Sequence, residues 1–213
     1  MNVSPSKENI LKKIRKALSH STPLPFPKSE GSESVFQPAT QEKEIEFAEQ
    51  FTKLQGRFIF CINQQELAFQ LNSLVKKMDW QKIFCLENDL LKAAGPQLTE
   101  RIVKTDLVNC DVSITGCECL VARTGTIVMS SAQTGGRTTS VYAPIHICIA
   151  YSNQLVYDIK DALQLVKDKY GTTTNLPSLI TFATGPSRTA DIEKTLVVGV
   201  HGPKEVYVFL VES

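Results

Sequence analysis

The spacing of hydrophobic residues divides the chain into helical and extended segments that alternate from about residue 41 onward. Leu67, Leu71 and Leu74 recur every three to four positions, which is the period of an amphipathic helix. Short apolar runs bounded by polar residues are typical of buried strands. By these criteria the sequence predicts helices at 45–54, 64–77, 89–94 and 153–169, and strands at 57–62, 82–86, 111–122, 126–130, 145–150, 177–183 and 205–211.

The alternation of strands and helices indicates parallel βαβ units, because a parallel strand pair needs a long crossover that a helix usually fills. The predicted fold class is therefore α/β, with a mostly parallel central sheet and helices on both of its faces. The chain has 213 residues, which is long enough to bury such a core in a single domain.

The first part of the chain differs in pattern from the rest. The apolar positions of residues 7–18 fall on one face of a predicted helix, with lysines on the other face. Prolines and serines dominate residues 21–38, which is a linker composition. We therefore expect residues 1–38 to form a helical arm and a Pro-rich linker, and residues 41–213 to form the α/β domain. Deleting the arm is expected to leave the domain folded and to weaken assembly.

Composition and charge exclude several classes of protein. The formal net charge is +1, so no strong electrostatic field favours nucleic acid or an acidic membrane surface. The longest apolar runs are much shorter than the roughly 20 residues that span a bilayer. Lys12, Lys13 and Arg15 interrupt the stretch where a secretory signal would have to be apolar. We therefore expect a cytoplasmic protein with no membrane span and no nucleic-acid partner.

The six cysteines are expected to be free thiols, because the cytoplasm is reducing. Four of them lie in short apolar stretches, where a free cysteine packs as a small hydrophobic residue. Cys117 and Cys119 form a Cys-x-Cys pair that lacks the two-residue gap usual in zinc and iron–sulfur sites. No metal site is therefore predicted, and the purified chain is expected to carry no iron or zinc of its own.

The clearest candidate binding segment directly follows the apolar run at residues 179–183. Its glycine lets backbone N–H groups approach an anion, and the guanidinium of Arg188 suits a carboxylate or a phosphate. Ligands of α/β sheets bind at the carboxyl ends of strands, so we expect this segment to hold a small anionic ligand. The alternative is a plain turn capped by Ser187 and Asp191. The candidate ligand-binding residues here are Gly185, Ser187, Arg188, Thr189 and Asp191.

Two further segments combine glycine with hydroxyl side chains. Residues 133–140 contain two glycines and an arginine, which suit an anion cradle, although a hairpin loop needs no ligand. Residues 115–126 contain two Thr-Gly pairs and Glu118, which is either a catalytic base or nucleophile or a surface carboxylate. The candidate ligand-binding residues in these segments are Thr115, Gly116, Thr124, Gly125, Thr126, Gly135, Gly136 and Arg137.

His201 lies in a Gly-Pro turn before the last predicted strand, and we expect it near the Gly185 segment. It is a candidate for binding the anionic group of the ligand or for moving a proton as a catalytic residue. The alternative is a turn histidine bonded to the backbone. The sequence has no P-loop, dinucleotide fingerprint or Gly-x-Ser-x-Gly elbow, so hydride transfer from a bound NAD is not expected.

Two motifs of the chain resemble those of the lactate utilization protein C family, the LUD domain. Residues 185–193 and 196–203 closely resemble its C-terminal signature, GPSRTADIE followed by LVVGVHGP. Residues 111–116 and 124–128 resemble its central motif, and the resemblance covers residues 41–213. It implies a fold similar to that of the ribose-5-phosphate isomerase and CoA-transferase group, also called NagB/RpiA/CoA transferase-like.

The resemblance also implies a function, namely a part in oxidising L-lactate to pyruvate together with iron–sulfur subunits. Those subunits would be the partners of this chain and would bind the clusters, so no cofactor is expected on the chain itself. The resemblance leaves open whether the chain is a scaffold, a ligand-binding subunit or an enzyme. The alternative is a stand-alone enzyme or binding protein for a phosphorylated sugar or an acyl-CoA, which the implied fold permits.

The sequence departs from the family pattern at two places. Arg123 replaces the acidic residue that commonly precedes the Thr-Gly-Thr turn, and Cys117-Glu118 replaces the usual Ala-Asp. If those carboxylates bind or react, their role falls to Glu118 alone. Arg123 would then add a positive contact for an acidic ligand.

Overall fold

The computed structural model describes residues 5–19, 38–171, 175–190 and 195–213. The chain divides into two compact units, residues 1–37 and residues 38–213. The first unit contains the helix α1 (Pro5–Leu18), on which the apolar side chains of Ile10 and Ile14 are exposed. The independence of this arm stays a prediction. None of the helices in the described ranges is both long and apolar enough to cross a membrane.

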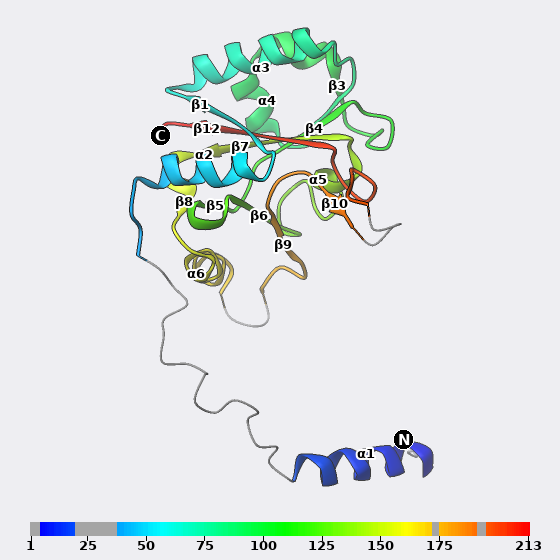
Figure 1. Cartoon of the computed structure of the whole chain (residues 1–213). Coiled ribbons are helices and arrows are strands. Elements are labelled where there is room, and N and C mark those ends of the chain that lie inside the picture. Colours follow the sequence, from blue (N-terminus) through cyan, green and yellow to red (C-terminus); the bar gives the residue numbers. More distant parts are fainter. Residues whose placement is uncertain (1–4, 20–37, 172–174, 191–194) are drawn as a thin grey trace. The chain divides into compact units, whose positions relative to one another are not determined.

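A parallel sheet of six strands lies at the centre of the second unit, counted over the described residues (Figure 1). Each pair of neighbouring strands in it is parallel. The predicted α/β fold with a mostly parallel central sheet is therefore confirmed. The order across the sheet is β1 (Arg57–Cys61), β12 (Glu205–Val211), β7 (Ile145–Tyr151), β4 (Val112–Thr115), β2 (Ile83–Phe84) and β3 (Ile102–Val103).

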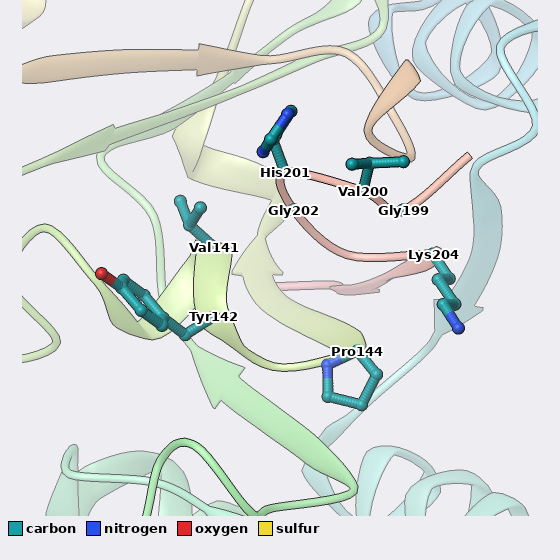
Figure 2. Close-up of a pocket in the computed structure, with 8 residues that line it drawn as sticks. All are labelled: Val141, Tyr142, Pro144, Gly199, Val200, His201, Gly202 and Lys204. Carbon is teal, nitrogen blue, oxygen red and sulfur yellow. The ribbon is translucent and has the colours of Figure 1, made fainter. Parts of the chain in front are cut away.

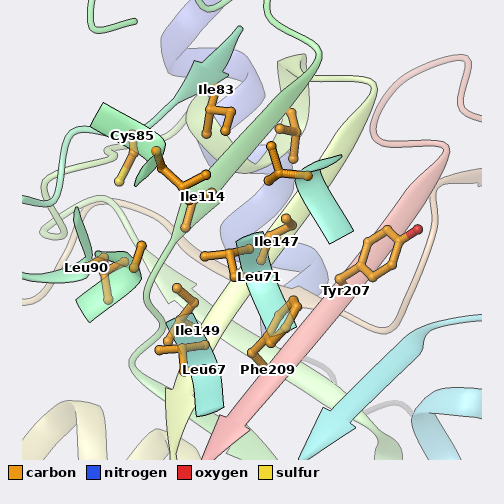
Figure 3. Packing of buried hydrophobic residues seen from close by; sticks show 14 of the residues in the cluster. Leu67, Leu71, Ile83, Cys85, Leu90, Ile114, Ile147, Ile149, Tyr207 and Phe209 are labelled. Atoms are coloured by element: carbon orange, nitrogen blue, oxygen red, sulfur yellow. The ribbon is translucent and has the colours of Figure 1, made fainter. Parts of the chain in front are cut away.

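One face of the central sheet is covered by helices α3 (Gln64–Met78) and α4 (Asn88–Ala94), with the 3-10 helix η1 (Pro96–Arg101) beside them. Helix α3 begins where the Asn63 side chain accepts a hydrogen bond from the Glu66 N–H, which satisfies a donor that the first turn leaves free. Its apolar stripe packs on the sheet in one buried cluster (Figure 3). That cluster includes Leu67, Leu71, Ile83, Leu90, Ile114, Ile147, Ile149 and Phe209.

The opposite face packs on helix α2 (Lys43–Lys53) and on a smaller sheet, so helices cover both faces (Figure 1). Phe47 and Phe51 of α2 are fully buried in a cluster with Val208 of β12. The smaller sheet is itself covered on its outer side by α6 (Ile159–Tyr170). Its order is β8 (Leu155–Val156), β5 (Cys119–Val121), β6 (Thr126–Ser130) and β9 (Ile180–Ala183). The remaining elements are η2 (Ala122–Thr124), α5 (Thr139–Tyr142), η3 (Ser152–Gln154), β10 (Arg188–Thr189) and β11 (Val197–Val198).

Three predicted elements differ from the observed ones in more than a shift of their ends. The predicted strand at 111–122 breaks after Thr115, because Gly116 to Glu118 carry the chain from the central sheet to the smaller one. The predicted helix at 153–169 begins only at Ile159. The predicted strand at 177–183 begins at Ile180 and is not buried, and it pairs antiparallel with β6. The segment after it therefore does not lie at the carboxyl edge of the central sheet.

The chain leaves neighbouring strands β2 and β4 in opposite directions. After β2 it passes over the α3 face through α4 to β3, and after β4 it passes over the other face through β5 and β6 toward β7. In open α/β sheets, the crevice outside the carboxyl ends of two such strands is the usual place for a ligand. Glu87 follows β2 closely in the chain, and Gly116 directly follows β4.

Candidate functional site

A small polar pocket lies at the carboxyl ends of β2 and β4, and we call it the switch-point pocket. Its volume is about 10 Å³, which is room for about one water molecule. Two of the predicted segments meet here, since a Cβ added at Gly135 would lie 3.6 Å from the methyl group of Thr115. The lining residues are Glu87, Thr115, Met129, Gln133, Gly135, Gly136, Thr139 and Ser140.

Glu87 directs its carboxylate toward Gly116. Its Oε1 accepts a hydrogen bond from the Gly116 N–H at 2.9 Å, and a Cβ at Gly116 would lie only 3.0 Å from its Oε2. Among the described residues, none donates a hydrogen bond to Oε2. Burial and the nearby charge of Glu118 raise the pKa of Glu87, although the Gly116 N–H opposes that shift. Glu87 is therefore a partly buried carboxyl group with one oxygen free to meet a ligand.

Thr115 contributes a hydroxyl group that is paired with a buried histidine. Its Oγ1 lies 2.8 Å from Nε2 of His146 in β7, and both residues are buried. Burial lowers the pKa of His146 to about 4, so the imidazole is neutral at pH 7. The sequence did not identify His146 as a candidate. Only the register of β4 against β7, which pairs Ser113 with His146, places it beside the pocket.

Glu118, the candidate base or nucleophile, is a buried carboxylate and not a surface one. Its Oε1 accepts hydrogen bonds from the Ser130 hydroxyl at 2.5 Å and the Tyr170 hydroxyl at 2.8 Å. Its Oε2 accepts one from the Lys169 ammonium group at 2.7 Å. Burial by itself would raise the pKa of Glu118, but these hydrogen bonds outweigh burial and lower it. Glu118 is therefore a fixed negative charge whose field reaches Glu87.

The Thr124-Gly125-Thr126 turn packs against α2 and does not line the switch-point pocket. Gly125 has a φ of +58°, and a Cβ there would lie 2.5 Å from the backbone nitrogen of Phe51. The hydroxyl oxygens of Thr124 and Thr126 lie 2.7 Å apart and bond to each other. Glycine is thus needed at this turn for a close approach of two backbones.

Arg123 forms an ion pair within the fold. Its Nε lies 2.6 Å from Oδ2 of Asp158, and its second nitrogen lies 3.2 Å from Oδ1. The Arg123 guanidinium holds the pKa of Asp158 below its usual range, and Asp158 directly precedes α6. The positive charge of Arg123 is therefore matched by Asp158 and is not directed toward the switch-point pocket.

Arg137 also turns away from the pocket. Its guanidinium donates a hydrogen bond to the Ser178 hydroxyl at 2.5 Å, on the segment that precedes β9. The glycines beside it, Gly135 and Gly136, line the pocket while the arginine does not. Of the segment predicted to cradle an anion, residues 133–140, glycines and hydroxyl side chains line the pocket and the arginine does not.

The Gly185 and His201 segments lie next to each other, as expected, and they do so at the amino edge of the central sheet. The Ser187 N–H donates to the Pro203 carbonyl at 2.9 Å, and the Gly199 N–H donates to the Ser187 carbonyl at 2.9 Å. Because β12 begins just after Pro203, these segments lie at the edge opposite the switch-point pocket. Asp191 lies outside the described residues.

A larger pocket of about 470 Å³ lies between α5 and the loop that contains His201 (Figure 2). Tyr142, His201 and Lys204 line it, and Figure 2 shows their side chains pointing in different directions. A small ligand is fixed by polar groups that converge on it. This pocket is therefore less suited to a small acid than the switch-point pocket, despite its size.

Arg188 donates a hydrogen bond to the backbone carbonyl of Leu54, next to the end of α2. We therefore expect Arg188→Ala to lower the free energy of unfolding by about 1 kcal/mol, the usual worth of one such bond. We expect it to leave affinity at the switch-point pocket unchanged. Thermal melting of both proteins with and without L-lactate measures the two effects. If lactate stabilises the wild type but not Arg188→Ala, the guanidinium belongs to the ligand site after all.

The cysteines do not gather into a metal centre in the part of the chain that the structure describes. All six are buried thiols, and no group of three or more histidine, cysteine, aspartate or glutamate side chains is placed there to hold an ion. Burial raises the pKa of Cys85 to about 11, so this thiol is neutral beside Glu87. The metal content of the purified protein stays a prediction.

Comparison with known proteins identifies relatives. Residues 81–211 match the family model of the LUD domain. Lactate utilization protein C of Bacillus licheniformis is 35% identical over 114 residues, which are 54% of this chain and 47% of that protein. The Bacillus subtilis protein of the same name is 37% identical over the same shares. The chain thus spans about half the length of the curated relatives it matches. A crystal structure of a DUF162 family protein from Deinococcus radiodurans has the same fold, with a TM-score of 0.58, 16% identity, and coverage of 79% of this chain and 96% of that one.

Proposed function

This chain belongs to the LUD domain family, and from that premise we propose that it serves lactate utilization by binding L-lactate or pyruvate in the switch-point pocket. The names of its curated relatives support the pathway. The position of the pocket, at the point where the chain leaves β2 and β4 in opposite directions, supports the site.

The observation that carries this proposal is the size and chemistry of the pocket. A volume of about 10 Å³ leaves no room for a sugar phosphate or a CoA ester, and a three-carbon acid would enter only if the loop between β6 and α5 moved outward. The described residues that line the pocket include no lysine or arginine, which are common partners of a phosphate group. The pocket therefore favours a small acid over the phosphorylated sugar or acyl-CoA of the alternative function.

Neutral donors on one wall of the pocket would hold the carboxylate of the acid. Oε1 of Gln133 accepts the Ser130 N–H at 2.9 Å, so the amide group of Gln133 is left to donate. Ser140 adds a hydroxyl group on the same loop and helix. Glu87 also lines the pocket, and its free Oε2 would face the C2 oxygen of the ligand.

We further propose that iron–sulfur subunits are the redox partners. Oxidation of lactate to pyruvate releases two electrons and two protons, so the reaction needs an electron acceptor. Iron–sulfur clusters in partner subunits would supply it, while this chain binds and orients the acid. Recovery of the tagged chain with such subunits from lactate-grown cells would support this part of the proposal.

Thermal melting of the purified chain with a panel of compounds tests the proposal. We expect L-lactate and pyruvate to raise the melting temperature, and ribose 5-phosphate and CoA to leave it unchanged. Ligand binding to the folded state stabilises it by mass action, so the shift should grow with concentration. A shift with the sugar phosphate or CoA alone would contradict the proposal and favour the stand-alone function.

A further inference from the structure

We propose that Glu87 makes the switch-point pocket discriminate between a 2-hydroxy acid and a 2-oxo acid, according to whether its free carboxyl oxygen carries a proton. This inference rests on the proposed function, because it concerns the same pocket and the same two acids.

The geometry of Glu87 leaves one oxygen for the ligand. Oε1 is held by the Gly116 N–H at 2.9 Å, which fixes the orientation of the carboxyl group. Oε2 accepts no hydrogen bond from the described residues, although Glu87 lines the pocket. The glycine at 116 permits this approach, because a Cβ there would lie 3.0 Å from Oε2. A ligand therefore meets a carboxyl group that is already positioned.

Charge decides how a small acid would lie in the pocket. Glu87 lines the pocket and Glu118 does not, and the charge of Glu118 is paired with the Lys169 ammonium group at 2.7 Å. An ionised Glu87 therefore makes its own side of the pocket unfavourable for a second carboxylate. The ligand carboxylate would therefore turn toward Gln133 and Ser140, the neutral donors that also line the pocket. The C2 oxygen sits on the neighbouring carbon of the ligand, so it would face Glu87.

The two acids differ in what their C2 oxygen can do. The hydroxyl group of lactate donates a hydrogen bond, whereas the keto oxygen of pyruvate only accepts one. An ionised carboxylate only accepts, so it pairs with lactate and repels the keto oxygen of pyruvate. A protonated carboxyl group donates, so it pairs with pyruvate. A site that hydrogen-bonds one group discriminates strongly against an analogue that lacks it.

The surroundings of Glu87 raise its pKa. Glu118, between β4 and β5, acts together with burial to raise the pKa of Glu87. The nearby thiols of Cys85 and Cys117 stay neutral. Burial raises the pKa of Cys85 to about 11, and a hydrogen bond with Cys148 together with burial raises the pKa of Cys117. The ammonium group of Lys104, which follows β3, is held by Asn88 at 3.2 Å. On the β7 side, Thr115 faces the pocket with His146 behind it, and His146 is neutral.

The test is the ratio of the two dissociation constants as a function of pH. We expect the ratio of pyruvate Kd to lactate Kd to fall by about ten- to a hundredfold as the pH is lowered through the titration of Glu87, the range expected for one hydrogen bond to a charged group. In Glu87→Gln the amide both donates and accepts, so the ratio should be nearly independent of pH. The matched control is Asp89→Asn, which removes an exposed carboxylate in α4 and should behave as the wild type.

A second measurement on the wild type keeps the test valid if Glu87→Gln fails to fold. The carboxyl carbon of Glu87 can be followed by NMR in a pH titration with saturating L-lactate or pyruvate. Pyruvate should raise the pKa of Glu87 more than lactate does, because both acids bring a negative charge near Glu87 but only the keto oxygen of pyruvate requires the protonated form. A ratio that does not change with pH, or equal effects of both acids on Glu87, would overturn the inference and leave the proposed function intact. If neither acid binds the wild type, the proposed function fails and the inference fails with it.

Discussion

Gly125→Ala is expected to lower the free energy of unfolding by about 2–5 kcal/mol, because two costs add at this position. The backbone of Gly125 has a φ of +58°, a conformation that an L-residue with a Cβ adopts only with strain. The new methyl group would also lie 2.5 Å from the backbone nitrogen of Phe51 and 2.8 Å from its Cα. Backbone atoms of a helix cannot move independently as a side chain can. The whole of α2 would therefore have to shift, which would disrupt its packing on the sheet.

Gly136→Ala is the matched control for this prediction. Gly136 has a nearly identical φ of +61°, but no described atom lies within 4 Å of a Cβ placed there. It therefore isolates the cost of backbone strain, about 1 kcal/mol. Urea unfolding of the two variants and the wild type measures the difference. Equal losses in both variants would mean that the turn does not pack on the α2 backbone as closely as described.

Glu118→Ala is the second change with a large expected effect, a loss of about 3–5 kcal/mol. The ammonium group of Lys169 and the hydroxyl groups of Ser130 and Tyr170 all lose their acceptor. Removal of the buried side chain also leaves a cavity. Because 53% of the Lys169 side chain is exposed and can turn to water, we expect a value near the lower end of this range.

The pH dependence of Glu118→Gln separates the charge from the packing. The pKa of Glu118 is lowered in the folded state, so its contribution to stability is present above the value of about 4.3 usual for an unfolded chain. That contribution is lost as the pH falls through the folded-state pKa. Glu118→Gln keeps the volume and one acceptor, so its loss relative to wild type should be large at pH 7 and smaller in acid. A loss that is the same at both pH values would show that Glu118 is not held as an ion.

The fold class could be predicted from the sequence because the hydrophobic periodicity of each helix and strand is a local pattern. The spacing of Leu67 and Leu71 predicts the buried face of α3, and the apolar run at residues 205–211 predicts a strand buried on both sides, β12. The predictions were wrong where tertiary context decides. The run at 111–122 is apolar on both sides of Gly116, so the sequence does not reveal that the two halves belong to different sheets.

The sequence identified only some of the residues that line the pocket, because no local pattern predicts the order of strands in a sheet. Thr115 and Gly135 were identified by their types, but Glu87 and His146 come to the pocket through the order β7-β4-β2, which joins distant parts of the chain. The reason for a glycine at a given position was also ambiguous in the sequence. A glycine permits the close approach of a ligand or of another backbone, and at Gly125 the neighbour is helix α2.

The most direct test of the central claim, that the switch-point pocket is the ligand site, is an NMR titration of the backbone amides of the full chain with L-lactate. We expect the largest shifts at Gly116, Gly135, Gly136 and Ser140, which lie in or directly beside the pocket. Saturation of these shifts at one common dissociation constant would establish a single site. Shifts confined to the loop from Gly199 to Lys204, or no shifts at any lactate concentration, would contradict the claim.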